Sequence, residues 1–329
     1  MTQSNPILVT GAAGFIGFHV SKVLLEQGHA VVGIDNLNDY YDPALKQSRL
    51  NQLADFKNFL FEKIDISNKE NMEKLWEEKG PFCKVIHLAA QAGVRYSLIN
   101  PYEYVASNCM GHLTVLEMCR HTKDFEHLVY ASSSSVYGRN EKLPYAVEDP
   151  VNHPVSLYAA TKRSDELMSE AYSNLYKLPQ TGLRFFTVYG PWGRPDMAPF
   201  IFTKSIIEGT PLKVFNHGKM KRDFTYIDDI VSGIVATLNC IPDGLKPHRI
   251  LNIGNSKSEN LLDFIHVLEK ATGKKAELQM MDIQPGDVKE TFADISETTK
   301  LTGFVPTTSI EDGLPQFVQW YRNYYLRNQ

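Results

Sequence analysis

A tyrosine and a lysine four positions apart, Tyr158 and Lys162, are the residues of this sequence best placed for acid–base chemistry. They open a helical pattern, and residues four apart lie on one face of a helix, so the phenol and the ammonium group point into the same site. The neighbouring positive charge favours the phenolate, which makes the phenol a usable base near neutral pH. Because this is the only Tyr-x-x-x-Lys segment of the chain, we predict that it carries the chemistry.

Hydroxyl and amide side chains are available to complete this site. Ser133, in a run of four serines, lies 25 residues before Tyr158 and follows an expected strand. Its hydroxyl can therefore reach the carboxyl edge of a sheet, where such sites form. Asn108, in an expected helix further upstream, either supports this polar set or is an ordinary helix residue whose hydrogen bonds are satisfied.

Three glycines at intervals of three residues, Gly11, Gly14 and Gly17, follow a short apolar run that is typical of a buried parallel strand. A helical pattern and a second strand come next, and that strand ends at Asp35. This order places a pyrophosphate at a helix N-terminus, while the aspartate accepts hydrogen bonds from the adenosine ribose. An acid at this position repels a 2′-phosphate, so the sequence predicts NAD rather than NADP.

Strand-like and helical segments alternate through the first half of the chain, which predicts an α/β fold with a Rossmann-type, doubly wound parallel sheet. The expected strands are residues 6–10, 30–35, 58–64, 84–89, 126–132 and 180–187. The alternation stops near residue 188, and a helix over 228–239 and a strand over 249–254 follow later. We therefore expect an NAD-binding domain over 1–187, to which 228–254 returns, and a smaller C-terminal α/β substrate-binding domain over 188–329.

The carboxyl ends of these strands carry further candidate cofactor contacts. Asp65 and Ile66 end the third strand, where the carboxylate can lie beside the adenine amino group. Small residues end the fourth strand, where a flat cofactor can lie close. The residues expected to contact NAD are Gly11, Ala13, Gly14, Phe15, Ile16, Gly17, Asp35, Asn36, Asp65, Ile66, Leu88, Ala89, Ala90, Asn108, Tyr158 and Lys162.

The composition excludes several classes of partner. The 329 residues are 43% hydrophobic and 22% charged, with a net charge of −4, which argues against nucleic acid and anionic membranes. No apolar run is long enough to span a bilayer and no signal peptide is recognisable, so we expect a cytoplasmic protein. The four cysteines form no C-x-x-C pair and the histidines show no ligand spacing, so no metal is predicted.

Two arginines are candidates for binding an anionic substrate. Arg194 lies in the Gly/Pro-rich segment GPWGRPDM, and Arg222 follows a basic stretch that includes Lys213, Lys219 and Lys221. Arginine suits bidentate capture of a carboxylate or a phosphate. The ordinary alternative for each is a solvated surface charge.

Several longer segments resemble the UDP-glucuronate 4-epimerases of the extended short-chain dehydrogenases/reductases: IDNLNDYYDPALK, HLAAQAGVRYS, YASSSSVYG, LYAATK, GLRFFTVYGPWGRPDMA and RDFTYIDDI. The resemblance covers nearly the whole chain. It implies that Tyr158 is the base, that Lys162 tunes it and contacts the nicotinamide ribose, and that Ser133 binds the 4-hydroxyl of the sugar. The implied substrate contacts are Arg95, Ser133, Ser134, Ser135, Tyr158, Thr187 and Arg194 around the sugar and its carboxylate, with Val214, Phe215, Asn216, Arg222 and Asp287 around UDP.

The same resemblance implies a mechanism, a partner and one departure. Carbon 4 is oxidised with NAD, the 4-keto sugar turns, and the hydride returns to the other face, so NAD is retained. A homodimer through the helix that carries Tyr158 is expected by analogy. Gln284 and Pro285 precede Gly286 and Asp287 where many relatives have an arginine, so this segment does not imply an additional arginine contact to the diphosphate.

Three alternatives remain beside epimerisation of UDP-glucuronate to UDP-galacturonate. Related dehydratases and decarboxylases carry an acid directly after the active-site hydroxyl, whereas Ser133 is followed by two serines. A UDP-glucose/UDP-galactose 4-epimerase would leave Arg194 without a charged partner. A non-catalytic NAD-binding sensor would not need the pair formed by Tyr158 and Lys162. We therefore predict an acidic-sugar epimerase.

Overall fold

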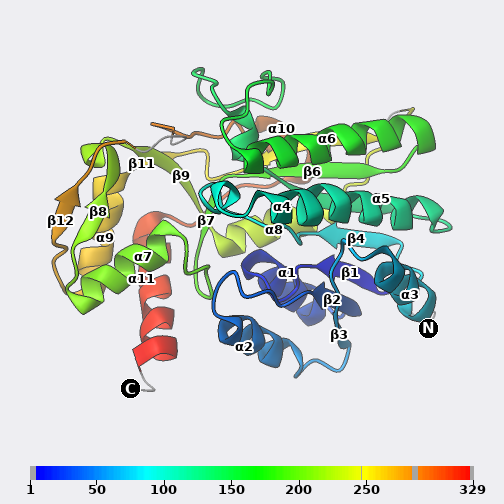
Figure 1. The fold of residues 1–329 in the computed structure, drawn as a ribbon, viewed down its shortest axis with the longest axis horizontal. Helices are drawn as coiled ribbons and strands as arrows, with labels where there is room; N and C mark the ends of the chain where they lie inside the picture. The colour runs from blue at the N-terminus through cyan, green and yellow to red at the C-terminus, as the bar shows by residue number, and fades with distance from the viewer. Residues whose placement is uncertain (1–4, 246, 284–287, 327–329) are drawn as a thin grey trace.

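A parallel sheet of seven strands, in the order β10-β6-β5-β4-β1-β2-β3, runs through the computed structural model, which describes residues 5–245, 247–283 and 288–326 (Figure 1). The strand order reverses between β1 and β4, which is where open α/β sheets bind ligands. The predicted fold class is confirmed. The strands are β1 (Ile7–Thr10), β2 (Val31–Asp35), β3 (Phe59–Lys63), β4 (Lys84–His87), β5 (His127–Ser133), β6 (Gln180–Phe185) and β10 (His248–Ile253).

Apolar side chains cover both faces of this sheet. Ile7 and Val9 of β1 pack into one core cluster, and Leu8 between them packs into another, because successive side chains of a strand point to opposite faces. Helices therefore lie on both faces, which accounts for the nearly continuous apolar runs of the strands. These helices include α1 (Phe15–Glu26), α2 (Pro43–Leu53), α3 (Lys69–Lys79), α5 (Gly111–His121), α6 (Leu157–Tyr176) and α8 (Ile227–Leu238).

A second group of elements lies to one side of the sheet, at the left in Figure 1. It contains a three-stranded sheet, β11-β9-β7, and a two-stranded sheet, β12-β8. Its strands are β7 (Thr187–Tyr189), β8 (Leu212–Val214), β9 (Lys221–Tyr226), β11 (Ser258–Asn260) and β12 (Leu278–Met280). Its helices are α7 (Ala198–Glu208), α9 (Leu261–Thr272) and α11 (Ile310–Tyr321), while α10 (Ser296–Thr302) packs near β10.

The predicted end of the strand over 180–187 is wrong. β6 ends at Phe185, and Thr187 already belongs to β7, which pairs with β9 in another sheet. Phe186 lies between the two strands, and its N–H donates a hydrogen bond to the carbonyl of Ile253 at the end of β10. β10 itself pairs with β6 in the central sheet, so the chain returns there after leaving it. The division into domains at residue 187 stays a prediction.

Candidate active site

A cavity of about 460 Å³ lies at the carboxyl ends of the central strands and extends to the loops that follow β6 and β7. It brings together residues from distant parts of the sequence, as expected at the reversal of strand order. The predicted residues that line it are Gly11, Gly14, Phe15, Ile16, Gly17, Asp35, Asn36, Asp65, Ile66, Leu88, Ala89, Ala90, Ser133, Ser134, Ser135, Tyr158, Lys162, Thr187, Arg194 and Arg222. These candidates from the catalytic, cofactor and substrate groups thus share one cavity.

Some predicted residues lie elsewhere. Ala13 is fully buried and is not among the cavity-lining residues, and its carbonyl accepts a hydrogen bond from Arg49 at 2.8 Å. The guanidinium of Arg95 lies over the ring of Phe215, 5.0 Å from its centroid. Val214 ends β8 and is buried in the core. Val214, Phe215, Asn216 and Arg95 are not among the cavity-lining residues, and Asp287 lies outside the described residues.

Asn108 lies behind the cavity wall rather than in it. Its Oδ1 accepts a hydrogen bond from the backbone N–H of Gln91 at 2.8 Å, and its Nδ2 donates to the Gln91 carbonyl at 3.1 Å. Nδ2 also lies 3.0 Å from the Thr161 hydroxyl, beside Lys162. The direct contact with NAD expected for Asn108 stays a prediction. In the structure its side chain, on a π-helical turn over Val105–Met110, links the segment after β4 to α6.

The glycine loop has the geometry that a pyrophosphate requires. Gly11 has a φ of 73°, and a Cβ there would come within 2.8 Å of the Ala89 backbone nitrogen, so only glycine fits. A Cβ on Gly17 would overlap the carbonyl of Gly11. Gly14 is the N-cap of α1, and no side chain in the described structure caps that helix. The first N–H groups of α1 are thus left for an anion.

Two acids end neighbouring strands at the other end of the cavity. Asp35, at the end of β2, accepts a hydrogen bond from the Leu37 N–H at 2.8 Å and lies 3.6 Å from Nζ of Lys46. Asp65 accepts from Asn36 at 2.9 Å. Burial alone would raise the pKa of Asp65, but hydrogen bonds from Ser67 and Asn36 hold it below its usual value. Both acids line the cavity, and these hydrogen bonds favour the carboxylate form of Asp65.

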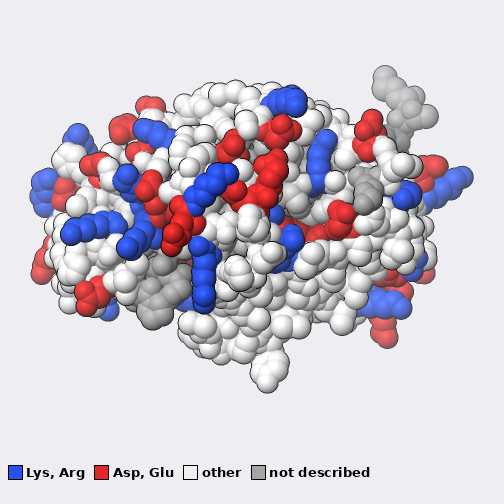
Figure 2. Space-filling view, turned by 90° about the horizontal axis from the view of Figure 1, so that it is seen from above, with Lys and Arg blue, Asp and Glu red and all other residues white. Residues whose placement is uncertain are grey.

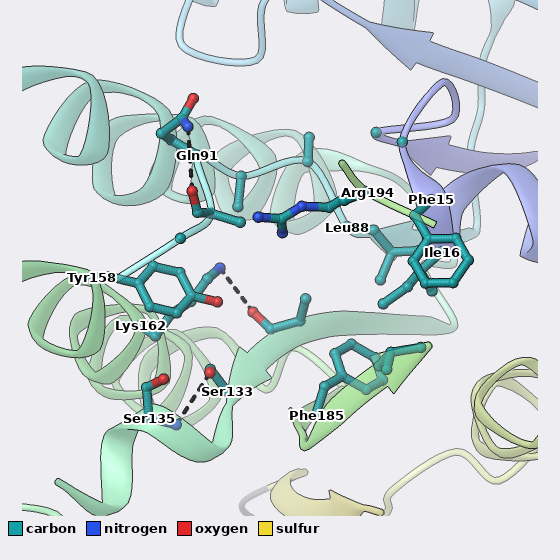
Figure 3. A pocket seen from close by; sticks show the side chains of 18 of the residues that line it. Phe15, Ile16, Leu88, Gln91, Ser133, Ser135, Tyr158, Lys162, Phe185 and Arg194 are labelled. Atoms are coloured by element: carbon teal, nitrogen blue, oxygen red, sulfur yellow. Dashed lines mark hydrogen bonds between the residues drawn. The ribbon is translucent and has the colours of Figure 1, made fainter. Parts of the chain in front are cut away.

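Tyr158 and Lys162 occupy the first turns of α6, which Ser156 caps by accepting from the Ala159 N–H at 3.1 Å. The phenol oxygen points into the cavity beside the Lys162 ammonium group (Figure 3). Nζ of Lys162 donates to the carbonyl of Ala131 at 2.9 Å, which ties α6 to β5. The helix thus presents both groups toward the end of β5, where the serines lie.

The serine run changes direction at the end of β5. Ser133 is the last residue of the strand and the N-cap of a short 3-10 helix, Ser134–Tyr137. Its Oγ accepts a hydrogen bond from the Ser135 N–H at 3.2 Å. The hydroxyl proton of Ser133 is left to donate, and the Ser133 side chain lines the same cavity as Tyr158 (Figure 3).

Arg194 reaches into the same cavity from the loop after β7 (Figure 3). Its Nε and Nη2 donate to the two carboxylate oxygens of Asp196, at 3.0 and 2.5 Å. The Tyr40 hydroxyl, from the loop after β2, donates to the same carboxylate at 2.9 Å. The arginine is therefore held by residues from two separate loops.

Comparison with known proteins agrees with this geometry. Residues 7–254 match the NAD dependent epimerase/dehydratase family. The chain belongs to this family. The chain is 46% identical over 332 residues to UDP-glucuronate 4-epimerase 3 of Arabidopsis thaliana. This alignment covers 97% of the chain and 77% of that relative.

Two solved structures of epimerases are also similar to the chain. One is UDP-glucuronic acid 4-epimerase from Bacillus cereus in complex with UDP-glucuronic acid and NAD, with a TM-score of 0.90, 38% identity, and coverage of 97% of this chain and 100% of that one. The other is UDP-glucose 4-epimerase from Thermotoga maritima with UDP-glucose, with a TM-score of 0.86, 31% identity, and coverage of 97% and 99%. Both likenesses extend over nearly the whole chain.

Within this epimerase/dehydratase chain, the cavity has lining residues that sequence reasoning missed, among them Asn38, Tyr40, Tyr41, Lys46 and Gln91. Lys46 is buried, and burial lowers its pKa although Asp35 opposes this. The sequence signal that could have identified Lys46 is its position on the apolar side of α2, beside Leu45 and Leu50. Buried lysines are rare unless they are paired.

Other features of the chain bear on its partners. Among the described residues, no group of His, Cys, Asp and Glu side chains could hold a metal ion. None of the helices in the described ranges has the length and apolarity needed to cross a membrane. On the face shown in Figure 2, acidic and basic side chains are interspersed.

Proposed function

We propose that this protein is a UDP-glucuronate 4-epimerase that retains NAD and interconverts UDP-glucuronate and UDP-galacturonate. The observation that carries the proposal is that Arg194 enters the same cavity as Tyr158, Lys162 and Ser133. An acid–base pair and a cation thus face one space, as an acidic sugar requires. The relatives and solved structures named for UDP-glucuronate support the same substrate.

The cavity fits NAD at three points. The glycines and the uncapped start of α1 suit its pyrophosphate, Asp35 suits the ribose hydroxyls, and Asp65 lies where the adenine amino group is expected. When bound, NAD supplies a hydride acceptor and donor for carbon 4 of the sugar. Lys46, paired with Asp35, adds a positive charge beside the ribose site.

Tyr158 and its neighbours supply the proton transfer. The Tyr158 phenolate takes the proton of the 4-hydroxyl as carbon 4 is oxidised, and returns it when carbon 4 is reduced from the other face. Lys162 stabilises the phenolate by its positive charge. Ser133 hydrogen-bonds the sugar oxygen and holds it beside the phenol. The proton stays within this set, so each turnover restores the starting protonation state.

The carboxylate of the substrate needs its own restraint. Oxidation at carbon 4 makes the uronic acid a β-keto acid, which loses CO2 when the carboxylate bond aligns with the carbonyl π system. Ser134, Ser135, Thr187 and Arg194 line the cavity and can hold the carboxylate out of that alignment. This restraint distinguishes an epimerase from a decarboxylase on the same fold.

A UDP-glucose 4-epimerase is the second candidate, and one observation favours it. The sequence argument against a neutral sugar, that Arg194 would lack a charged partner, is wrong because Asp196 pairs with it in the structure. Arg194 is therefore satisfied without a substrate carboxylate. The Thermotoga maritima structure shows the same fold in an enzyme named for UDP-glucose.

Assembly and location extend the proposal. Apolar side chains are exposed on the segment around Pro101–Tyr104 and on α6, which supports a homodimer through the helix that carries Tyr158. They are Leu98, Ile99, Tyr102, Val105 and Met110 on the first segment, and Leu167, Leu175 and Tyr176 on α6. The four cysteines are free thiols, which supports a reducing, cytoplasmic setting.

Incubating the purified protein with UDP-glucuronate, without added NAD, tests the function. NMR should show UDP-galacturonate, and denaturation should release NAD or NADH. Parallel incubation with UDP-glucose identifies the second candidate. Turnover of UDP-glucose with none of UDP-glucuronate would overturn the proposed substrate, and release of NADP would overturn the proposed cofactor.

A further inference from the structure

Lys162 forms a buried ion pair that the proposed mechanism does not use. Its Nζ lies 3.0 Å from Oδ2 of Asp165, one helical turn further along α6. Both side chains are almost completely excluded from solvent, at 4% and 1% exposure. The second carboxylate oxygen of Asp165 is buried as well and has no hydrogen-bond partner within the described ranges.

This carboxyl group is held in an unfavourable environment for a full negative charge. Burial raises the pKa of Asp165 to about 6, although Lys162 opposes the rise. Glu166 on the same helix also raises it, but that carboxylate is itself paired with Arg184 of β6 at 2.8 Å. An orphaned oxygen and a raised pKa agree, because an unbonded carboxylate oxygen is costly in a dry interior.

The titratable groups that face the pair of Lys162 and Asp165 from other elements are uncharged at neutral pH. Burial raises the pKa of Cys109, on the π-helical turn, and of Tyr130, on β5. Burial lowers the pKa of His87, on β4, to about 3, and it also lowers that of His112, on α5. All four are therefore uncharged at neutral pH, and Asp165 is the anion closest to Lys162 in the described structure.

We propose that Asp165 is a positioning residue that holds the Lys162 ammonium group and partly cancels its charge, and so sets the pH at which Tyr158 works as the base. The proposal rests on the function proposed above for Tyr158. Lys162 has two acceptors, the Ala131 carbonyl and Asp165, and these fix its ammonium group. Of these two acceptors only Asp165 carries a charge, so Asp165 is the one that changes the electrostatic environment of Tyr158.

The physical consequence has a definite sign. When Asp165 is ionised, its negative charge opposes formation of the Tyr158 phenolate. When Asp165 is protonated, below about pH 6, that opposition disappears. An asparagine at this position keeps an oxygen for the Lys162 ammonium group but never carries the charge. Asp165→Asn should therefore behave like the wild type at low pH and differ from it above.

The pH dependence of turnover in Asp165→Asn tests this. Below about pH 6 the two rates should coincide. Between about pH 6 and the alkaline plateau, turnover by the variant should be faster by about threefold to tenfold. The Coulomb repulsion between the Asp165 carboxylate and the Tyr158 phenolate is expected to be of that order. A merely structural role predicts a slower variant at every pH. Equal or lower rates across the whole profile would overturn the proposal.

A matched control comes from the same helix. Glu170 also carries a negative charge on α6, but it pairs with His248 at 2.8 Å instead of Lys162. Glu170→Gln removes one charge without touching the Lys162 site, so its profile should overlay that of the wild type. A shift as large as that of Asp165→Asn would show that net charge is responsible, and the proposal would fail.

A second readout is independent of the substrate. Ultraviolet difference titration of tyrosinate should show one tyrosine ionising at lower pH in Asp165→Asn, and Tyr158→Phe in that background should remove the signal. An unchanged titration would overturn the proposal even if no UDP-sugar is turned over, which separates it from failure of the proposed function. Should the asparagine variant not fold, Asp165→Ser removes the same charge with a smaller side chain and predicts the same shift.

Discussion

The guanidinium of Arg194 is held edge-on by the carboxylate of Asp196, with Nε 3.0 Å from Oδ1 and Nη2 2.5 Å from Oδ2. Burial alone would raise the pKa of Asp196, but Arg194 and Tyr40 hold it below its usual value. This pairing uses one edge of the guanidinium, and Nη1 makes no hydrogen bond within the described residues. A planar donor fixed on one side offers its free edge to the cavity.

Replacing Arg194 by alanine should weaken binding of UDP-glucuronate much more than binding of UDP-glucose, because a guanidinium makes a stronger, charge-assisted contact with a carboxylate than with a hydroxyl. The variant should also form UDP-4-keto-pentose and CO2 from UDP-glucuronate, since the carboxylate is no longer held away from the carbonyl. Steady-state kinetics on both sugars and NMR of the products measure these effects.

The control for Arg194→Ala is Arg120→Ala. Arg120 also pairs with a carboxylate close in sequence, Glu117 at 2.7 Å, but on a surface helix outside the cavity. Its loss should leave both sugars unaffected. Equal losses on both sugars in Arg194→Ala, without decarboxylated product, would show that Arg194 does not manage the carboxylate.

Replacing Tyr158 by phenylalanine should lower turnover by roughly 10²–10⁴-fold, because the ring packing remains but the ionisable oxygen is lost. Affinity for the UDP-sugar, measured by calorimetry, should change little. Tyr137 is the alternative base suggested by the sequence, but its hydroxyl is buried and donates to Asn252 at 2.7 Å. Burial raises the pKa of Tyr137 to about 12.

Tyr137→Phe therefore serves as the comparison. It should lower the free energy of unfolding, since Asn252 loses a buried partner, while turnover stays within a few-fold of the wild type. The reverse pattern, with activity lost in Tyr137→Phe and kept in Tyr158→Phe, would exchange the two assignments.

Replacing Gly14 by valine should abolish cofactor retention without unfolding the sheet. Gly14 has φ −74° and ψ 172°, which other residues adopt readily, and a Cβ there would lie 3.0 Å from the Gly11 carbonyl oxygen. The side chain would occupy the approach of the pyrophosphate. Absorbance of the cofactor released by denaturation, together with circular dichroism, measures both outcomes.

Gly28 provides the matched substitution at the other end of α1. It has a φ of 87° and open space around its Cβ direction, so valine there strains the backbone without reaching the cavity. This variant should be less stable and still retain the cofactor. Retention by Gly14→Val would contradict the assigned pyrophosphate site.

Replacing Asp223 by asparagine should change the pH dependence of stability. Burial raises the pKa of Asp223 to about 6, although the N–H groups of Asn255 and Ala293 donate to it. Its pKa in the folded state thus exceeds that of the unfolded chain, so its contribution is greatest at low pH and is lost as pH rises through about 6. The stability advantage of the wild type should shrink by about 1–3 kcal/mol between pH 4 and 7.

Urea unfolding at several pH values measures the Asp223 effect. Asp55→Asn, at an exposed position, is the control and should show a difference that does not vary with pH. An advantage of the wild type over Asp223→Asn that grows with pH would mean that the carboxyl group is stabilised as an anion, contrary to this account.

The sequence alone was sufficient for the features that depend on short-range spacing. Three glycines where a strand passes into a helix indicate a tight turn, and residues four apart on a helix share a face. The glycines from Gly11 to Gly17 and the pair of Tyr158 and Lys162 could therefore be identified from the sequence. The parallel sheet followed from the alternation of apolar strands with helices. These features need only local geometry, and the cavity indeed contains them.

Tertiary structure alone decided which distant groups meet. Tyr40 donates to Asp196 because the loops after β2 and β7 converge at the carboxyl edge of the sheet. Lys46 pairs with Asp35 because α2 packs back against the end of β2. Asn108 accepts a hydrogen bond from the Gln91 backbone, a contact between two elements that spacing does not reveal. The ionisation of Asp165 depends on burial, which spacing does not reveal, because the removal of water is a property of the packed molecule.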